Sequence, residues 1–178
     1  LLEEESLDVC VRVKPNGAVK ALGNVRNGPT FLTDCTAAGG VPMAPKAAVL
    51  GVDGAAATGP TVQLWSDPIA QNPALDATET WELWNWSADA HPIHLHLVKF
   101  KVQDRQLIGG ATRPPEATEA GWKDTVIAYP GEVTRVKATF DKEGLYVWHC
   151  HIVEHEDNEM MVPFCVGDAA SAPGCAGL

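Results

Sequence analysis

Short stretches of alternating apolar residues, separated by turn residues from Thr61 onward, constrain the fold of this chain more than any other feature. Alternation with a period of two is typical of β-strands, and no segment with a helical period is longer than two turns. Pro130-Gly131 is predicted to join two strands as a hairpin. This pattern predicts an all-β fold, an antiparallel sandwich or barrel. The predicted strands are residues 62–65, 78–86, 94–103, 124–129, 133–140, 145–152 and 161–166.

The 178 residues are enough for one domain. Residues 1–13 predict an initial strand, and residues 25–60, rich in Gly, Ala, Pro and Thr, predict an irregular connection. Residues 105–121, with Gly109-Gly110 and Pro114-Pro115, predict a loop long enough to carry function. We therefore expect a single domain over 1–178. Its predicted parts are an initial strand and connection at 1–59, a core at 60–166 and a tail at 167–178.

The charge of the chain bears on its partners. Thirteen Lys and Arg residues against 23 Asp and Glu residues give a net charge of −10, which disfavours nucleic acid and anionic membranes as partners. No apolar stretch reaches the roughly 18 residues of a membrane span. The chain begins at Leu1 without a signal peptide, which suggests a processed chain or a piece of a longer one.

Five cysteines are an odd number, so at least one lies outside any intrachain disulfide. Four of them occupy loop-like positions near the two ends of the chain, and the simplest pairing is Cys10 with Cys35 and Cys165 with Cys175. Other pairings, and free thiols, remain open. Disulfides persist in oxidising compartments, so the expected location is extracytoplasmic or secreted. The fifth cysteine, Cys150, lies between two histidines.

All six histidines fall within residues 91–96 and 149–155. Because side chains on a strand alternate between its two faces, residues of equal parity point the same way. His91 then points to the opposite face from His94 and His96, and Cys150 points to the opposite face from His149 and His151. This sorts the candidate ligands into two groups. The first group is His91, Cys150, His155 and Met160, and the second is His94, His96, His149 and His151.

One thiolate, two imidazoles and a thioether form the ligand set of a blue-copper electron-transfer site, with Met160 as the weak axial ligand. Four imidazoles suit copper or zinc but are too few to fill several metal sites. The peptide bonds around Cys150 would join the two sites, so an electron could pass between them. Zinc alone would gain nothing from a cysteine between two histidines that point the other way. Separately, these residues are also typical of a buried thiol, core methionines or a chance His-x-His pair.

At these residues the chain resembles the multicopper oxidases, specifically their C-terminal cupredoxin domain, a Greek-key β-sandwich or barrel. His91-Pro-Ile-His-Leu-His96 and the segment from His149 to Met161 resemble the two C-terminal copper signatures of that family. Trp65-Ser-Asp-Pro, Trp81-Glu-Leu-Trp-Asn85 and Gly121-Trp-Lys-Asp-Thr125 resemble the branch of spore-coat laccase, phenoxazinone synthase and bilirubin oxidase. The similarity is clear over residues 60–166 and looser over 1–59.

The resemblance implies a role for each ligand. His94 would bind a type 2 copper, and Glu156 matches an acidic position that helps to deliver protons during oxygen reduction; alternatively, it is a solvated charge in an acidic run. In this family, phenols, aromatic amines, bilirubin-like pigments or metal ions are oxidised and dioxygen is reduced to water. The implied type 1 copper ligands are His91, Cys150, His155 and axial Met160, and the implied type 3 ligands are His96, His149 and His151.

The chain departs from the family in its number of histidines. The chain has six histidines. The resemblance implies that two of them serve the type 1 site and that the other four are half of the eight that the family's trinuclear cluster needs. The resemblance therefore implies a C-terminal domain whose partners are the N-terminal cupredoxin domains of the same enzyme. A stand-alone blue-copper electron carrier is the alternative, although it leaves four histidines without a role. A copper nitrite reductase fits less well, because it needs only one histidine beside the cysteine.

Overall fold

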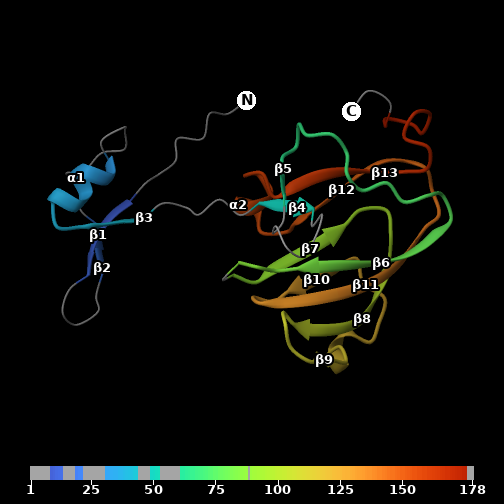
Figure 1. The fold of residues 1–178 in the computed structure, drawn as a ribbon, viewed down its shortest axis with the longest axis horizontal. Helices are drawn as coiled ribbons and strands as arrows, with labels where there is room; N and C mark the ends of the chain where they lie inside the picture. The colour runs from blue at the N-terminus through green and yellow to red at the C-terminus, as the bar shows by residue number, and fades with distance from the viewer. Residues whose placement is uncertain are drawn as a thin grey trace. The chain divides into compact units, whose positions relative to one another are not determined.

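The computed structural model describes residues 9–13, 19–21, 31–43, 49–52, 61–87 and 89–175. The chain divides into two compact units, residues 1–46 and 47–178 (Figure 1). In the first unit, β1 (Val9–Val13) is the middle strand of an antiparallel sheet, between β2 (Val19–Ala21) and β3 (Val41–Met43). Helix α1 (Phe31–Ala37) precedes β3.

The initial strand is confirmed as β1. The stretch predicted as irregular contains α1, β3 and a further strand, β4 (Leu50–Val52). Helix α1 was not predicted for two reasons. Its sequence, FLTDCTA, contains several residues of low helix propensity, and seven residues are too few to reveal a helical period. Pro15-Asn16-Gly17, whose sequence predicts a turn after the initial strand, lies outside the described residues.

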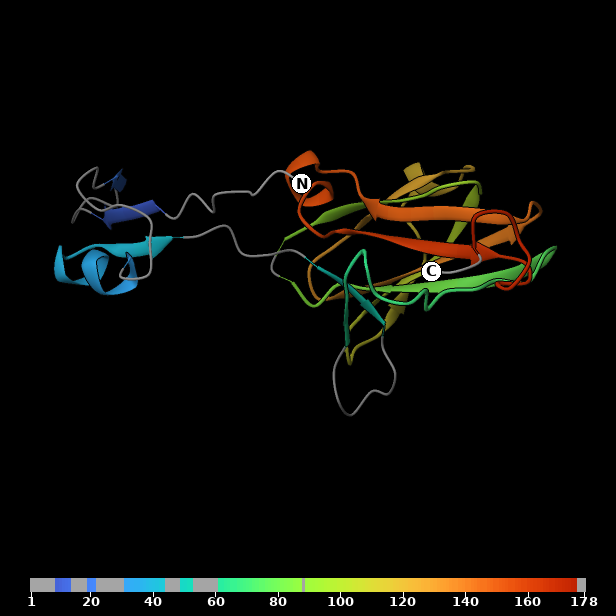
Figure 2. The ribbon, with the colours of Figure 1, turned by 90° about the horizontal axis from the view of Figure 1, so that it is seen from above.

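The second unit is built on two four-stranded antiparallel sheets (Figures 1 and 2). The first sheet has the order β10-β7-β12-β13, and the second has the order β6-β11-β8-β9. A separate two-stranded sheet pairs β4 with β5 (Thr61–Gln63). The strands of the large sheets are β6 (Ala77–Trp84), β7 (His91–Leu95), β8 (Phe100–Leu107), β9 (Thr112–Arg113), β10 (Thr125–Ala128), β11 (Glu132–Phe140), β12 (Gly144–Cys150) and β13 (Met161–Val166). Two short helices, η1 (Ala117–Glu119) and α2 (Val153–Glu156), lie in the connections.

The inner faces of the two sheets share one hydrophobic core. Trp81 of β6 lies with its ring centroid 5.6 Å from Phe140 of β11 and 5.6 Å from Phe164 of β13, so an aromatic cluster spans both sheets. Alternate residues of β7 are buried in this core: His91, Ile93 and Leu95. The all-β sandwich expected from the strand pattern is confirmed.

Two sequence predictions about neighbouring strands were wrong. Residues 94–103, predicted as one strand, are divided between β7 and β8, which lie in different sheets. The extended conformation is interrupted between these strands at Leu97, where φ is +73°. The turn at Pro130-Gly131 exists, with Gly131 at φ +68°, but it joins β10 to β11 across the two sheets instead of closing a hairpin. Alternation identifies a strand and its inward face but not the strand to which it bonds.

Residues 105–121, predicted as a loop, contain the end of β8, all of β9 and the helix η1, so the loop prediction was wrong for those residues. A buried ion pair holds η1 against the strands. The Arg105 side chain is fully buried, and its Nε donates to Glu119 Oε2 at 3.0 Å. Its Nη1 donates to Thr134 Oγ1 and its Nη2 to the Ile127 carbonyl, both at 2.9 Å. Arg105 therefore ties β8, β10, β11 and η1 together. Hydrogen bonding to Arg105 lowers the pKa of Glu119, against the opposing effect of burial.

The cysteine predictions are partly tested. A disulfide joins Cys165 to Cys175, with 5.9 Å between their Cα atoms, as predicted. Cys35 is disulfide-bonded, but the side chain of Cys10 lies outside the described part of the chain, so the Cys10–Cys35 pairing stays a prediction. Among the described cysteines, Cys150 is the free thiol, and it is buried. None of the described helices is long and apolar enough to cross a bilayer.

Candidate metal centres

The pairing of β7 with β12 brings the two histidine segments together. The register aligns Trp148 with Leu95, His149 with His94, and Cys150 with Ile93. Cys150 is fully buried, as is the inward face of β7 that carries His91. The ligand atom of Cys150 groups with those of His91 and His155, whereas that of His149 groups with those of His94 and His96, so the opposition of Cys150 to His149 expected from parity is present.

The first cluster is made by Cys150, His91 and His155. Cys150 Sγ lies 3.7 Å from His91 Nδ1 and 3.7 Å from His155 Nδ1, and the two nitrogens are 3.2 Å apart. The ligand atoms of all three residues lie within 4.8 Å of one another. A buried thiol facing two imidazole nitrogens is a donor set that suits copper, because thiolate and imidazole are both ligands that copper prefers.

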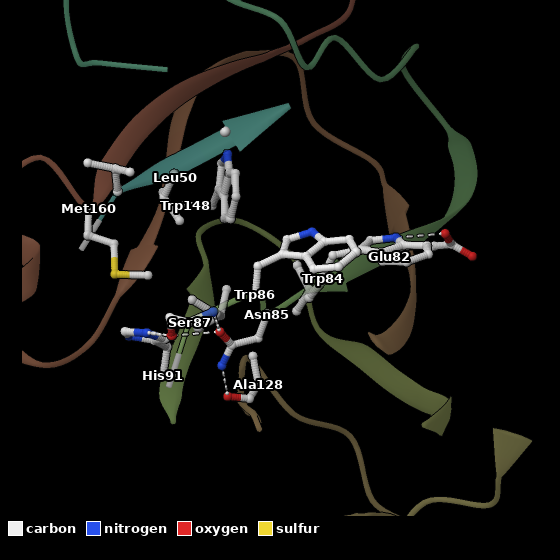
Figure 3. A pocket seen from close by; sticks show the side chains of 14 residues that line it. Leu50, Glu82, Trp84, Asn85, Trp86, Ser87, His91, Ala128, Trp148 and Met160 are labelled. Atoms are coloured by element: carbon white, nitrogen blue, oxygen red, sulfur yellow. Dashed lines mark hydrogen bonds between the residues drawn. The ribbon is translucent and has the colours of Figure 1, made fainter. Parts of the chain in front are cut away.

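Helix α2 and the residues after it bring His155 and Met160 to this cluster. The Cys150 amide donates to the Met160 carbonyl at 3.0 Å, and the Met160 amide donates to the His155 carbonyl at 3.1 Å. The Met160 side chain is buried, and Figure 3 shows it at the same end of a cavity as His91. The structure thus gathers all four residues of the first predicted group.

Without a metal ion, the two groups of the first cluster with shifted pKa values, His91 and Cys150, both favour their neutral forms. Burial lowers the pKa of His91, and the nearby His155 lowers it further, so the His91 imidazole is neutral at neutral pH. Burial raises the pKa of the Cys150 thiol, a hydrogen bond with the backbone of Ile152 partly opposes this, and the charge of Glu156 adds to the rise. A metal ion is the positive charge that would make Cys150 a thiolate here.

The second cluster lies on the opposite face of the same two strands. His96 Nε2 is 3.3 Å from His149 Nε2, and the ligand atoms of His94, His96 and His149 lie within 4.8 Å of one another. The ring of His151 is 5.8 Å from that of His94 and 5.4 Å from that of His149. The predicted second group is therefore assembled, with His151 at its margin. Burial and the neighbouring His94 and His149 lower the pKa of His96, which keeps its imidazole neutral.

Two of these histidines have their second ring nitrogen occupied by the protein. His94 Nδ1 lies 2.9 Å from the Asp124 carbonyl and 3.0 Å from Thr125 Oγ1. His149 Nδ1 lies 3.0 Å from its neighbour's carbonyl and 3.3 Å from Glu156 Oε2. Such contacts fix the tautomer and leave Nε2 as the ligand atom, as in many metal sites. The contacts from Asp124 and Thr125 were not predicted, although both residues belong to a stretch noted for its resemblance.

A cavity of about 380 Å³ opens beside the first cluster. Figure 3 shows His91 and Met160 at one end, with the indoles of Trp84 and Trp86 further along. These two indoles are partly exposed and stack with ring centroids 5.7 Å apart. None of residues 105–121, all of which the structure describes, lines this cavity.

The sequence profile of one family, described as multicopper oxidase, matches residues 44–170. The chain belongs to the multicopper oxidase family. A laccase of Bacillus subtilis is 45% identical over an alignment of 118 residues that covers 58% of this chain and 23% of that protein. A laccase of Haloferax volcanii is 55% identical over 95 residues, which are 53% of this chain and 16% of that protein.

Solved multicopper oxidases share the fold. The metallo-oxidase of Campylobacter jejuni matches with a TM-score of 0.55 and 31% identity, covering 60% of this chain and 22% of that one. McoA of Aquifex aeolicus matches with a TM-score of 0.54 and 30% identity, covering 61% and 26%. The matched part of this chain thus spans between 16% and 26% of the length of these four relatives. Family membership establishes a multicopper oxidase cupredoxin domain of the laccase-like kind and implies copper as the metal.

Proposed function

We propose that this chain is the C-terminal cupredoxin domain of a laccase-like multicopper oxidase, and that its first cluster is the type 1 copper site. His91, Cys150 and His155 would be the strong ligands and Met160 the weak axial ligand. The convergence of the Cys150 sulfur with two imidazole nitrogens at 3.7 Å, in a buried site, carries this proposal. An axial methionine favours a moderate copper potential.

The second cluster would supply half of the ligands of a trinuclear copper centre. His94 would bind the type 2 copper, and His96, His149 and His151 would bind the type 3 coppers. The N-terminal cupredoxin domains of the same enzyme would supply the other half. The close approach of His96 Nε2 to His149 Nε2, with the Nδ1 atoms of His94 and His149 held by the protein, supports this division.

Copper bound at these sites would supply one-electron oxidation of a reducing substrate and the reduction of dioxygen to water. The residues of this chain would connect the two reactions. Because Cys150 faces one cluster while His149 and His151 face the other, an electron would pass between them through covalent bonds of the backbone. Glu156, whose carboxylate lies 3.3 Å from His149 Nδ1, would hold a proton for oxygen reduction.

The reducing substrates that fit this proposal are phenols, aromatic amines or similar one-electron donors. The laccase name of several relatives supports this class. The Cys165–Cys175 disulfide supports an extracytoplasmic or secreted location, because disulfides persist in oxidising compartments.

The test is to load the intact protein with copper and to measure visible absorption and oxygen consumption. We expect a blue protein, a colour that Cys150→Ser abolishes because it removes the thiolate. The matched variant His151→Ala, on the opposite face, should stay blue but lose oxygen consumption. A Cys150→Ser protein that remained blue would overturn the type 1 assignment. A blue protein that consumed no oxygen with its N-terminal domains present would favour the electron carrier instead.

A further inference from the structure

The side chain of Ser87, in the connection between β6 and β7, lies against the far edge of the His91 ring. Ser87 Oγ is 2.8 Å from His91 Nε2 (Figure 3), while His91 Nδ1 faces Cys150 on the other side. Both ring nitrogens of a buried histidine are therefore engaged, one by the candidate metal cluster and one by a hydroxyl. This contact lies outside the two ligand groups predicted from the sequence.

Asn85 holds Ser87 in place. Its Oδ1 accepts from the Ser87 amide at 2.9 Å and from Ser87 Oγ at 2.7 Å. Its Nδ2 donates to the carbonyls of Asp89 and Ala128, at 2.7 and 2.9 Å. The Asn85 side chain is buried, so the loss of these hydrogen bonds would leave buried polar atoms unsatisfied and destabilise the protein. Its amide side chain thus has each end fully occupied.

The backbone of Asn85 is fixed as well. Its amide donates to the Glu132 carbonyl at 3.0 Å, and its carbonyl accepts from the Gly131 amide at 2.9 Å. Asn85 therefore joins the end of β6 to the turn between β10 and β11. A short polar segment is in this way anchored to both sheets, immediately before the first candidate ligand.

The hydroxyl proton of Ser87 determines which ring nitrogen of neutral His91 carries a proton. Ser87 Oγ has a single proton, and its shortest acceptor is Asn85 Oδ1, which has no proton of its own to give. When that proton goes to Asn85, the hydroxyl can only accept from His91, so Nε2 must carry the ring proton. His91 Nδ1 is then unprotonated and faces Cys150 Sγ.

We propose that Asn85 and Ser87 form a positioning relay that sets the Nε2–H tautomer of His91 and directs its Nδ1 to the metal. This inference deepens the proposed type 1 site and rests on it. Neither Asn85 nor Ser87 belongs to the first cluster of candidate ligands. In the absence of Ser87, the His91 Nε2–H would lose its partner and the ring would lose its fixed orientation. Loss of such an outer contact weakens metal binding by about 10- to 100-fold.

The first experiment needs no metal. Nitrogen-15 NMR of the copper-free, intact protein distinguishes the two imidazole tautomers, and we expect the Nε2–H form for His91. In Ser87→Ala, this tautomer should lose its dominance and the ring proton should exchange faster with water. Ser66→Ala is the matched control, because it removes an exposed hydroxyl elsewhere on the surface. An Nδ1–H tautomer in the native protein would overturn the relay.

The second experiment uses copper(II) as the probe. We measure its affinity by competition with a chelator and the potential of the blue site by anaerobic titration. Ser87→Ala should stay blue, because Cys150 is intact, but should bind copper about ten-fold more weakly and show a shifted potential. Ser87→Thr, which keeps the hydroxyl, should restore both values.

The outcomes separate the two proposals. A native protein that binds copper without becoming blue would contradict the type 1 site itself. A blue native protein whose copper affinity and potential are unchanged in Ser87→Ala would contradict only the relay. A change of equal size in Ser66→Ala would also contradict it, because the effect would then not depend on the contact with His91.

Discussion

Replacement of Glu119 by Gln should destabilise the protein by removing the main counter-charge of a fully buried arginine. Arg105 is completely inaccessible, and Glu119 faces it with both carboxylate oxygens while its own side chain is 12% exposed. Gln keeps the shape of the side chain but cannot compensate the guanidinium charge. The change in stability of Glu119→Gln therefore reports the loss of the negative charge and not a loss of packing.

The magnitude follows from the other partners of the guanidinium. Removing one partner of a buried ion pair costs about 3–5 kcal/mol. Glu132 Oε2 lies 3.7 Å from Arg105 Nη1, and Thr134 Oγ1 and the Ile127 carbonyl keep their hydrogen bonds, so some compensation remains. We therefore expect the lower end of that range, about 3 kcal/mol.

The assay is urea unfolding at pH 7, with Glu116→Gln as the matched control. Glu116 lies three residues away and pairs with Arg113 at 2.7 Å, but on the surface, with 56% of its side chain exposed. An exposed pair contributes at most about 1 kcal/mol, so the same substitution there should have a small effect. If the two variants lost equal stability, the argument from burial would be wrong.

The effect should also depend on pH in one direction. The pKa of Glu119 is lower in the folded protein than in the unfolded chain, so the folded state favours the charged form. The stabilisation is then fully present above the unfolded pKa, about 4.3, and is lost as the pH falls through the folded pKa. The difference between native protein and Glu119→Gln should shrink below that pH. A difference that stayed constant down to acid unfolding would show that charge is not its source.

Three further predictions concern the Cys165–Cys175 disulfide, Glu156 and the binding of copper. Replacing both Cys165 and Cys175 by Ala opens a link between residues ten apart, and loop-closure entropy predicts a loss of about 2.7 kcal/mol in urea unfolding; an unchanged midpoint would refute it. In the whole oxidase, Glu156→Gln should slow oxygen consumption about 100-fold without altering the blue absorption, and an undiminished rate would leave Glu156 as a surface charge. Copper(II) at 100 times its dissociation constant should raise the free energy of unfolding by about 2.7 kcal/mol, an increase that a chelator should reverse in calorimetry; if it appeared equally in Cys150→Ser, the first cluster would not be its source.

The grouping of the candidate ligands was predictable because strand parity is a local property. Cys150 and His149 lie on opposite faces of β12 as the alternation requires, and His91 and His94 lie on opposite faces of β7 for the same reason. Strand parity could not predict the position of His155, because this residue lies in helix α2 and not in a strand. It was predicted from the chemistry of the ligand set and from the resemblance.

The contacts that orient the ligands were not predictable from the sequence. Ser87 reaches His91 only because Asn85 folds the chain back against the turn between β10 and β11. Thr125 reaches His94 because β10 pairs with β7, a partner that alternation does not specify. Such contacts depend on which strands lie side by side, and this is decided by packing across the whole sandwich.

The pairing of β7 with β12 governs both clusters at once. Its register places His149 opposite His94 and Cys150 opposite Ile93. Because side chains alternate, a slip of one residue would turn Cys150 away from His91 and put a neighbouring histidine in its place. A variant that weakens this pairing must therefore impair both candidate metal sites together. A variant in α2 that displaces His155 should impair the first cluster much more than the second, because the second cluster's histidines all come from β7, β12 and the residues directly after them.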